Sequence, residues 1–87
     1  MKSRHHKIKL LKEYVPLVVS GKKSFDIRRN DKDYKVGDTI EFLPVENSHG
    51  ETVRIHMSEI EGKIYQIDYL TTFGLQEGYV AFSIKEI

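Results

Sequence analysis

Short alternations of apolar and polar residues recur along this chain, and they constrain its fold more than any other feature. In His6-Lys7-Ile8-Lys9-Leu10, Ile8 and Leu10 point one way while Lys7 and Lys9 point the other. Alternation with a period of two is typical of half-buried β-strands. Further strands are predicted over residues 24–29, 39–42 and 63–69, in a segment with Val53, Ile55 and Met57 as its inward row, and in one with Val80, Phe82 and Ile84.

One early helix interrupts this pattern. Leu11, Val15 and Val18 lie at i, i+4 and i+7, which places them on one helical face, and Gly21 is suited to end the helix. About six short strands at a spacing of roughly 8–12 residues, with this helix, predict a mainly β (α+β) fold. We expect a small, closed or nearly closed β-barrel with the helix packed on it, formed by residues 1–87 as a single domain.

Composition excludes several classes of protein. The 87 residues contain no cysteine, so a disulfide framework, a thiolate zinc site and a cysteine nucleophile are excluded. No apolar segment approaches the length of a membrane span. The N-terminus is basic but leads into no long apolar segment, so we expect no secretory signal and a cytoplasmic location.

The net charge of +1 conceals an asymmetry along the chain. Residues 1–35 hold eleven Lys or Arg against four acidic residues, whereas residues 36–87 hold three against nine. A chain charged in this way is able to present a basic face to an anionic ligand. Alternatively, the two halves interleave in space and neutralise each other.

Gly21, Lys23, Asp26 and Arg28 form the segment that most resembles a functional site. The expected strand places Asp26 and Arg28 on one face, two residues apart, so their side chains are neighbours. A carboxylate between cations would leave N–H donors free for a phosphate or a carbonyl group. The alternative is an ordinary surface pair that contributes little.

This spacing, Gly21-x-Lys23-x-x-Asp26-x-Arg28, resembles the Gly-x-Lys-x-x-Glu-x-Arg signature of the ASCH domain, a branch of the PUA-like superfamily. The opening strand from His6 to Leu10, the segment 25–38 and Gly78-Tyr79-Val80 are similar to a small bacterial and phage ASCH-like family of uncharacterised function. The resemblance implies a PUA-like β-barrel with a cleft between helix and barrel, lined by the motif residues. Asp26 is one methylene shorter than the usual glutamate.

We therefore expect a nucleic-acid-binding module, with RNA or a nucleotide-like ligand as the partner. Asp26 would orient the cations or accept a hydrogen bond from a base edge. Tyr34 would either stack on a base or pack in the fold, and His6 would either contact a phosphate, serve as an acid or base, or remain solvated. The phosphate contacts are predicted to be Lys7, Lys9, Lys23, Arg28 and Arg29.

Two other functions remain open. Some ASCH relatives resemble amidohydrolases acting on N4-acetylcytidine; here Lys23 would be the base, Asp26 would orient water and Arg28 would stabilise the oxyanion, with Ser24 as the available hydroxyl. In that branch a threonine stands at the position of Asp26, and an aspartate supplies no hydroxyl nucleophile, so binding is favoured over catalysis. The third function is a non-catalytic module for a small ligand or protein. His49 and His56 lack metal-ligand spacing, so neither a metal nor a cofactor is expected.

Overall fold

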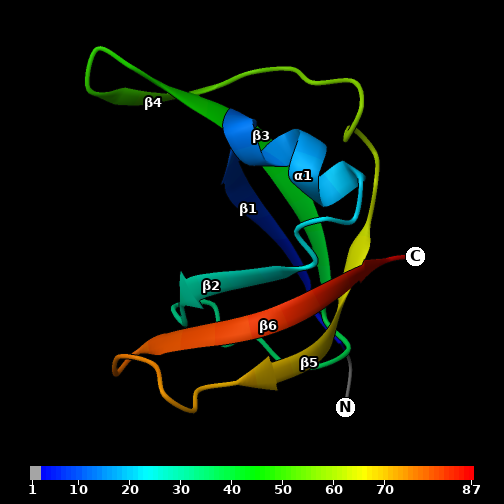
Figure 1. The fold of residues 1–87 in the computed structure, drawn as a ribbon, viewed down its shortest axis with the longest axis vertical. Coiled ribbons are helices and arrows are strands. Elements are labelled where there is room, and N and C mark those ends of the chain that lie inside the picture. The colour runs from blue at the N-terminus through cyan, green and yellow to red at the C-terminus, as the bar shows by residue number, and fades with distance from the viewer. Residues whose placement is uncertain (1–2) are drawn as a thin grey trace.

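A single six-stranded sheet makes up most of the molecule (Figure 1). The computed structural model describes residues 3–87; Met1 and Lys2, part of the basic N-terminal segment, lie outside the described residues. The strands are β1 (His5–Leu11), β2 (Phe25–Arg29), β3 (Thr39–Ser48), β4 (Glu51–Arg54), β5 (Tyr65–Thr71) and β6 (Tyr79–Glu86). The expected mainly β fold with one short helix is confirmed.

The sheet curves without closing. Its order is β1-β3-β5-β6-β2, with β4 paired to β3 outside this path. β1 runs parallel to β3, and the other pairings are antiparallel. β1 and β2 are therefore the two ends of the path, and no ladder joins them. The expected barrel is only approximate, because an open seam remains between β1 and β2.

The helical segment connects these two end strands. A 3-10 turn, η1 (Lys12–Tyr14), continues into helix α1 (Val15–Val19), which buries Val15 and Val18. Pro16 lies in the first turn, where the missing N–H is tolerated. Gly21 follows with φ of +82°, a left-handed conformation that ends the helix at low steric cost, as predicted.

The core lies on the inner face of the curved sheet. Ile8 and Leu10 of β1 and Val80, Phe82 and Ile84 of β6 are all buried, in agreement with the alternation in the sequence. Val15 of α1 packs into the same cluster. Within residues 3–87, no helix has the length and apolar character needed to cross a membrane.

The prediction for residues 53–57 is wrong. Val53, Ile55 and Met57 do not form the inward row of one strand, because β4 ends at Arg54 and all four of its residues are exposed. The β3–β4 hairpin projects away from the rest of the sheet (Figure 1), so no second layer covers it. Met57 reaches the core from the segment that follows the strand.

Candidate functional site

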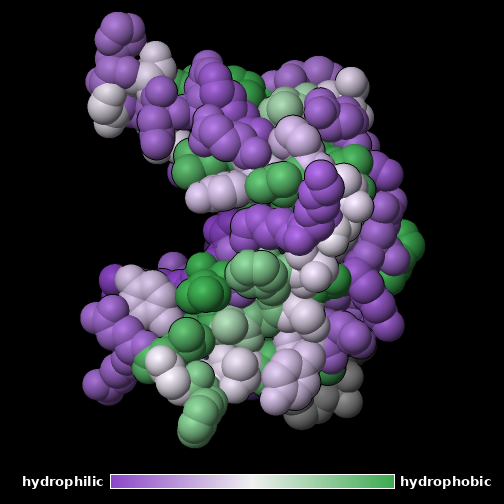
Figure 2. Space-filling model, in the orientation of Figure 1, coloured by the Kyte–Doolittle hydropathy of each residue, from purple (hydrophilic) through white to green (hydrophobic). Residues whose placement is uncertain are grey.

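The open seam between β1 and β2 forms a cleft. Its volume is about 1080 Å³, and its walls come from β1, the helical segment, β2 and the loop after β2. Figure 2 shows this hollow between the part of the molecule that carries α1 and the part that carries β2 and β6, with hydrophobic and hydrophilic surface on its borders. The cleft is large enough for a nucleotide-sized ligand.

The lining of the cleft is basic and aromatic. It includes seven Lys or Arg side chains against two Asp, and four aromatic side chains. None of the nine acidic residues of positions 36–87 lines it. The basic half of the sequence therefore faces the cleft without being neutralised there by the acidic half. The charged lining residues are Lys7, Lys9, Lys22, Lys23, Asp26, Arg28, Arg29, Asp31 and Lys32.

Asp26 and Arg28 form a partly buried ion pair at the seam. Arg28 Nε donates to Asp26 Oδ2 over 2.8 Å, and Asp26 is only 8% exposed. Asp26 Oδ1 accepts a hydrogen bond of 2.9 Å from the amide of Ile27. The Arg28 guanidinium also donates through Nη2 to the carbonyl of Lys9, and so it links β2 to β1 across the seam. This geometry differs from a solvent-screened surface pair.

Lys23 lies on the same cleft, directly after the turn at Gly21. Its Nζ donates to the carbonyl of Phe25 over 2.9 Å. The ammonium also lies 4.6 Å from the ring centroid of Phe25 and 5.3 Å from that of Tyr14, within cation–π range. These contacts hold the ammonium in one place beside the apolar wall of the cleft.

The motif side chains thus satisfy backbone groups that the open seam leaves unpaired. Lys23 contacts the Phe25 carbonyl, Asp26 the Ile27 amide, and Arg28 the Lys9 carbonyl. Unpaired edge groups are a liability in open sheets, so these contacts have a structural role. Lys23 and Arg28 each keep further N–H donors, which line the cleft and are available to an anionic ligand.

Strand β2 turns Asp26 and Arg28 inward and Phe25 and Ile27 outward. Phe25 and Ile27 are 52% and 51% exposed, whereas Asp26 is buried. Alternation in the sequence separates the two faces correctly but does not tell which of them is inside. Because β2 is an end strand, both Phe25 and Asp26 border the cleft.

Most of the predicted site residues meet in this cleft, and two do not. Lys7, Lys9, Arg29 and Tyr34 line it together with Lys23, Asp26 and Arg28. Ser24 lines a separate hollow of about 200 Å³ and is not among the residues of the cleft. His6 is buried inside the fold and is also not among them.

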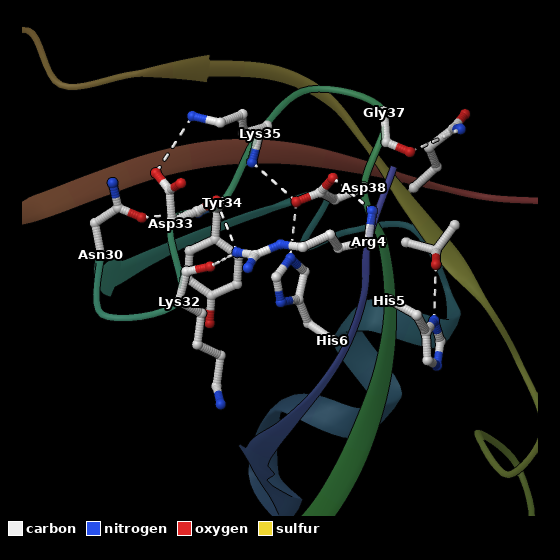
Figure 3. Close-up of polar contacts among 12 residues, drawn as sticks. Arg4, His5, His6, Asn30, Lys32, Asp33, Tyr34, Lys35, Gly37 and Asp38 are labelled. Atoms are coloured by element: carbon white, nitrogen blue, oxygen red, sulfur yellow. Dashed lines mark hydrogen bonds and ion pairs between the residues drawn. The ribbon is translucent and has the colours of Figure 1, made fainter. Parts of the chain in front are cut away.

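His6 belongs to a buried network around Asp38, which the sequence did not single out (Figure 3). His6 Nε2 lies 2.8 Å from Asp38 Oδ2. The same carboxylate accepts hydrogen bonds from the amides of Arg4, over 3.0 Å, and Lys35, over 3.1 Å. Burial alone would raise the pKa of Asp38, but the Arg4 amide, His6 and the Lys35 amide together hold it below its usual range.

The network fixes the loop between β2 and β3. Arg4 donates from Nη2 to the carbonyls of Lys32 and Asp33, and the Asn30 side chain accepts from the Tyr34 amide over 2.9 Å (Figure 3). Asp38 is separated from His6 by 32 residues, so no local spacing in the sequence reveals the pair.

Tyr34 packs in the fold. It is 4% exposed, and the rings of His6 and Phe82 lie 4.8 Å and 5.1 Å from it. Burial raises the pKa of its phenol, opposed by the nearby positive charge of Arg28. Of the two roles left open for Tyr34, the structure supports packing.

No group of three or more metal-ligating side chains occurs in the described part of the chain.

Comparison with known proteins identifies the family to which this chain belongs. A search of curated proteins finds no match. The model of the family described as "Domain of unknown function (DUF3850)" matches residues 5–84, a range that includes all the side chains lining the cleft. The chain therefore belongs to the DUF3850 family.

Proposed function

We propose that the cleft between β1 and β2 binds single-stranded RNA. The observation that carries the proposal is the lining, in which seven cationic side chains, two carboxylates and four aromatic rings share one hollow. Cationic grooves with aromatic side chains are the common solution for single-stranded nucleic acids, because the cations contact phosphates while the rings contact bases.

The individual cations divide into two groups. Lys7 and Lys9 project from the exposed face of β1 and are free to follow a flexible phosphate backbone. Lys23 and Arg28 are fixed by their contacts with carbonyl groups and with Asp26. Fixed donors lose less conformational entropy on binding, so they would set the register of the ligand.

The resemblance to ASCH and PUA-like proteins is part of the same proposal. Lys23, Asp26 and Arg28 meet at one cleft beside the helix, which is where that resemblance would put a ligand, and Gly21 forms the turn just before Lys23. We also propose a cytoplasmic location, which is compatible with an RNA ligand. Amide hydrolysis receives less support, because Ser24, the available hydroxyl, lies outside the cleft.

The test is an anisotropy titration with a fluorescent single-stranded RNA at several salt concentrations. We expect binding that weakens steeply with salt, with a slope of about −0.7 in log K per phosphate contact. The double variant Lys7→Gln/Lys9→Gln should bind more weakly, and the magnitude of its total salt slope should be smaller by about 1.4, because two phosphate contacts are lost.

Lys35→Gln is the matched control. Lys35 is an exposed lysine of the same basic half, but it does not line the cleft. Its substitution should leave both affinity and slope close to those of the parent protein. Absence of binding at about 50 mM salt, or equal losses in both variants, would contradict the proposal.

A further inference from the structure

We propose that Phe25 is the stacking platform for one unpaired base of the bound strand, with the Tyr14 ring beside it. This inference rests on the proposed function and adds the part of the ligand that enters the apolar side of the cleft. It assigns the base to β2 and η1 and not to Tyr34.

The first observation is the exposure of the apolar side chains. Phe25 is 52% exposed, Ile27 51%, Tyr14 41% and Leu17 39%, and all four line the cleft. Large apolar side chains gathered at one concave place commonly mark a binding site. The Lys23 ammonium lies against the rings of Phe25 and Tyr14, yet all four residues stay exposed, although the neighbouring Asp26 is buried.

The second observation is the position of Lys23. Its ammonium lies against the rings of Phe25 and Tyr14 and is held by the Phe25 carbonyl. A base stacked on Phe25 would therefore bring its own phosphate or carbonyl oxygen close to a fixed cation. This combination of an aromatic face and an anchored positive charge fits a nucleotide, because the base would contact the ring while the negatively charged phosphate would lie near the ammonium.

The other aromatic side chains of the cleft are less available. Tyr34 is 4% exposed between His6 and Phe82. Tyr79 is half-buried. Phe25 is the most exposed ring of the lining, so the stacking position falls there.

The experiment compares two ligands of equal charge. One is a labelled single-stranded RNA of about eight nucleotides, and the other is an abasic strand of the same length. Each is titrated by anisotropy with the parent protein and with Phe25→Ala, Phe25→Leu and Phe25→Trp. Phe73→Ala is the control, because Phe73 is a 92% exposed ring that does not line the cleft.

We expect Phe25→Ala to weaken binding of RNA by about 5- to 150-fold and to leave the abasic strand within about twofold. Phe25→Leu should resemble Phe25→Ala, since it keeps apolar area but removes the ring, whereas Phe25→Trp should retain parent-like affinity. Phe73→Ala should bind both strands like the parent. Phe25 is exposed, so these variants are expected to fold, and thermal melts check this.

Three results would overturn the inference while leaving the cleft as an RNA site: equal loss for both strands, full affinity of Phe25→Leu, or equal affinity of the parent protein for RNA and abasic strand. Failure of the parent protein to bind either strand at low salt is a different result. It would overturn the proposed function itself.

Discussion

Asp26 and Asp38 are the two buried carboxylates of this molecule's described residues, and their surroundings differ in kind. Asp38 is 3% exposed and receives its hydrogen bonds from two backbone amides and His6, all inside the fold. Asp26 is 8% exposed and bonds to Arg28, which lines the cleft. The comparison indicates that one carboxylate fixes a loop, while the other orients a cation that lines the cleft.

The largest effect is expected from Asp38→Asn. This change places an amide group against the Arg4 and Lys35 amides and weakens the contact with His6, so the protein should lose about 2–3 kcal/mol of unfolding free energy. Urea denaturation measures this loss. Asp33→Asn is the control, because Asp33 is exposed and contacts Lys35 at 3.3 Å on the surface. Equal losses in both variants would remove the special role of Asp38.

A smaller loss of stability is expected from Asp26→Asn, on the order of 1 kcal/mol. The substitution weakens the ion pair between Asp26 and Arg28, which is partly solvated and lies at the open seam of the sheet. The same urea series gives the value. A loss as large as that of Asp38→Asn would mean that the seam pair is primarily a structural element, and the contrast between the two carboxylates would fail.

Arg28→Ala should separate binding from stability. Removal of the guanidinium takes away donors that line the cleft, so RNA affinity should fall about three- to tenfold at about 0.1 M salt. Asp38→Asn, measured under conditions where it is folded, should bind RNA with nearly parental affinity, since Asp38 does not line the cleft. If Asp38→Asn lost more RNA affinity than Arg28→Ala, the proposed division between a structural Asp38 and a cleft-lining Asp26–Arg28 pair would be contradicted.

Acid should remove the contribution that ionised Asp38 makes to the stability of the fold. The pKa of Asp38 is lower in the folded protein than its ordinary value of 3.8, so its ionised form stabilises the fold above that value. This contribution is lost as the pH falls through the lowered folded pKa. The stability gap between the parent protein and Asp38→Asn should therefore be full near pH 7 and shrink below about pH 4. A gap that stays constant down to about pH 2 would contradict this assignment.

The smallest effect is expected from Tyr34→Phe. Because Tyr34 packs between His6 and Phe82, its ring is retained by the substitution, and RNA affinity should change by less than about twofold. Anisotropy titration beside Phe25→Ala provides the comparison. A loss as large as that of Phe25→Ala would return the stacking role to Tyr34.

Much of the fold was accessible from the sequence, because alternation is a local signal. The strands around Ile8 and Phe82 and the helix ending before Gly21 were predicted at their places. The inward row predicted from Val53 to Met57 was wrong, because the alternation of apolar and polar residues continues in a projecting hairpin that no second layer covers. The sequence left open whether the barrel closes fully, since strand count does not reveal whether a sheet closes.

The candidate site was predictable only where its residues are close in the chain. Lys23, Asp26 and Arg28 lie within one short segment, and the structure brings all three to one cleft. The pairing of His6 with Asp38 depends on the parallel register of β1 and β3, which no local spacing encodes. The exposure of Phe25 depends on which face of β2 turns inward, and the alternation leaves that choice open.

Nuclear magnetic resonance with a ¹⁵N-labelled protein and unlabelled single-stranded RNA would locate the ligand without any substitution. We predict amide shift changes concentrated in β1 and β2, at Lys7, Lys9 and the segment Phe25–Arg29, with the β3–β4 hairpin unchanged. Changes confined to other surfaces, or a spectrum that RNA leaves unaltered, would show that the seam between β1 and β2 is not a nucleic-acid site.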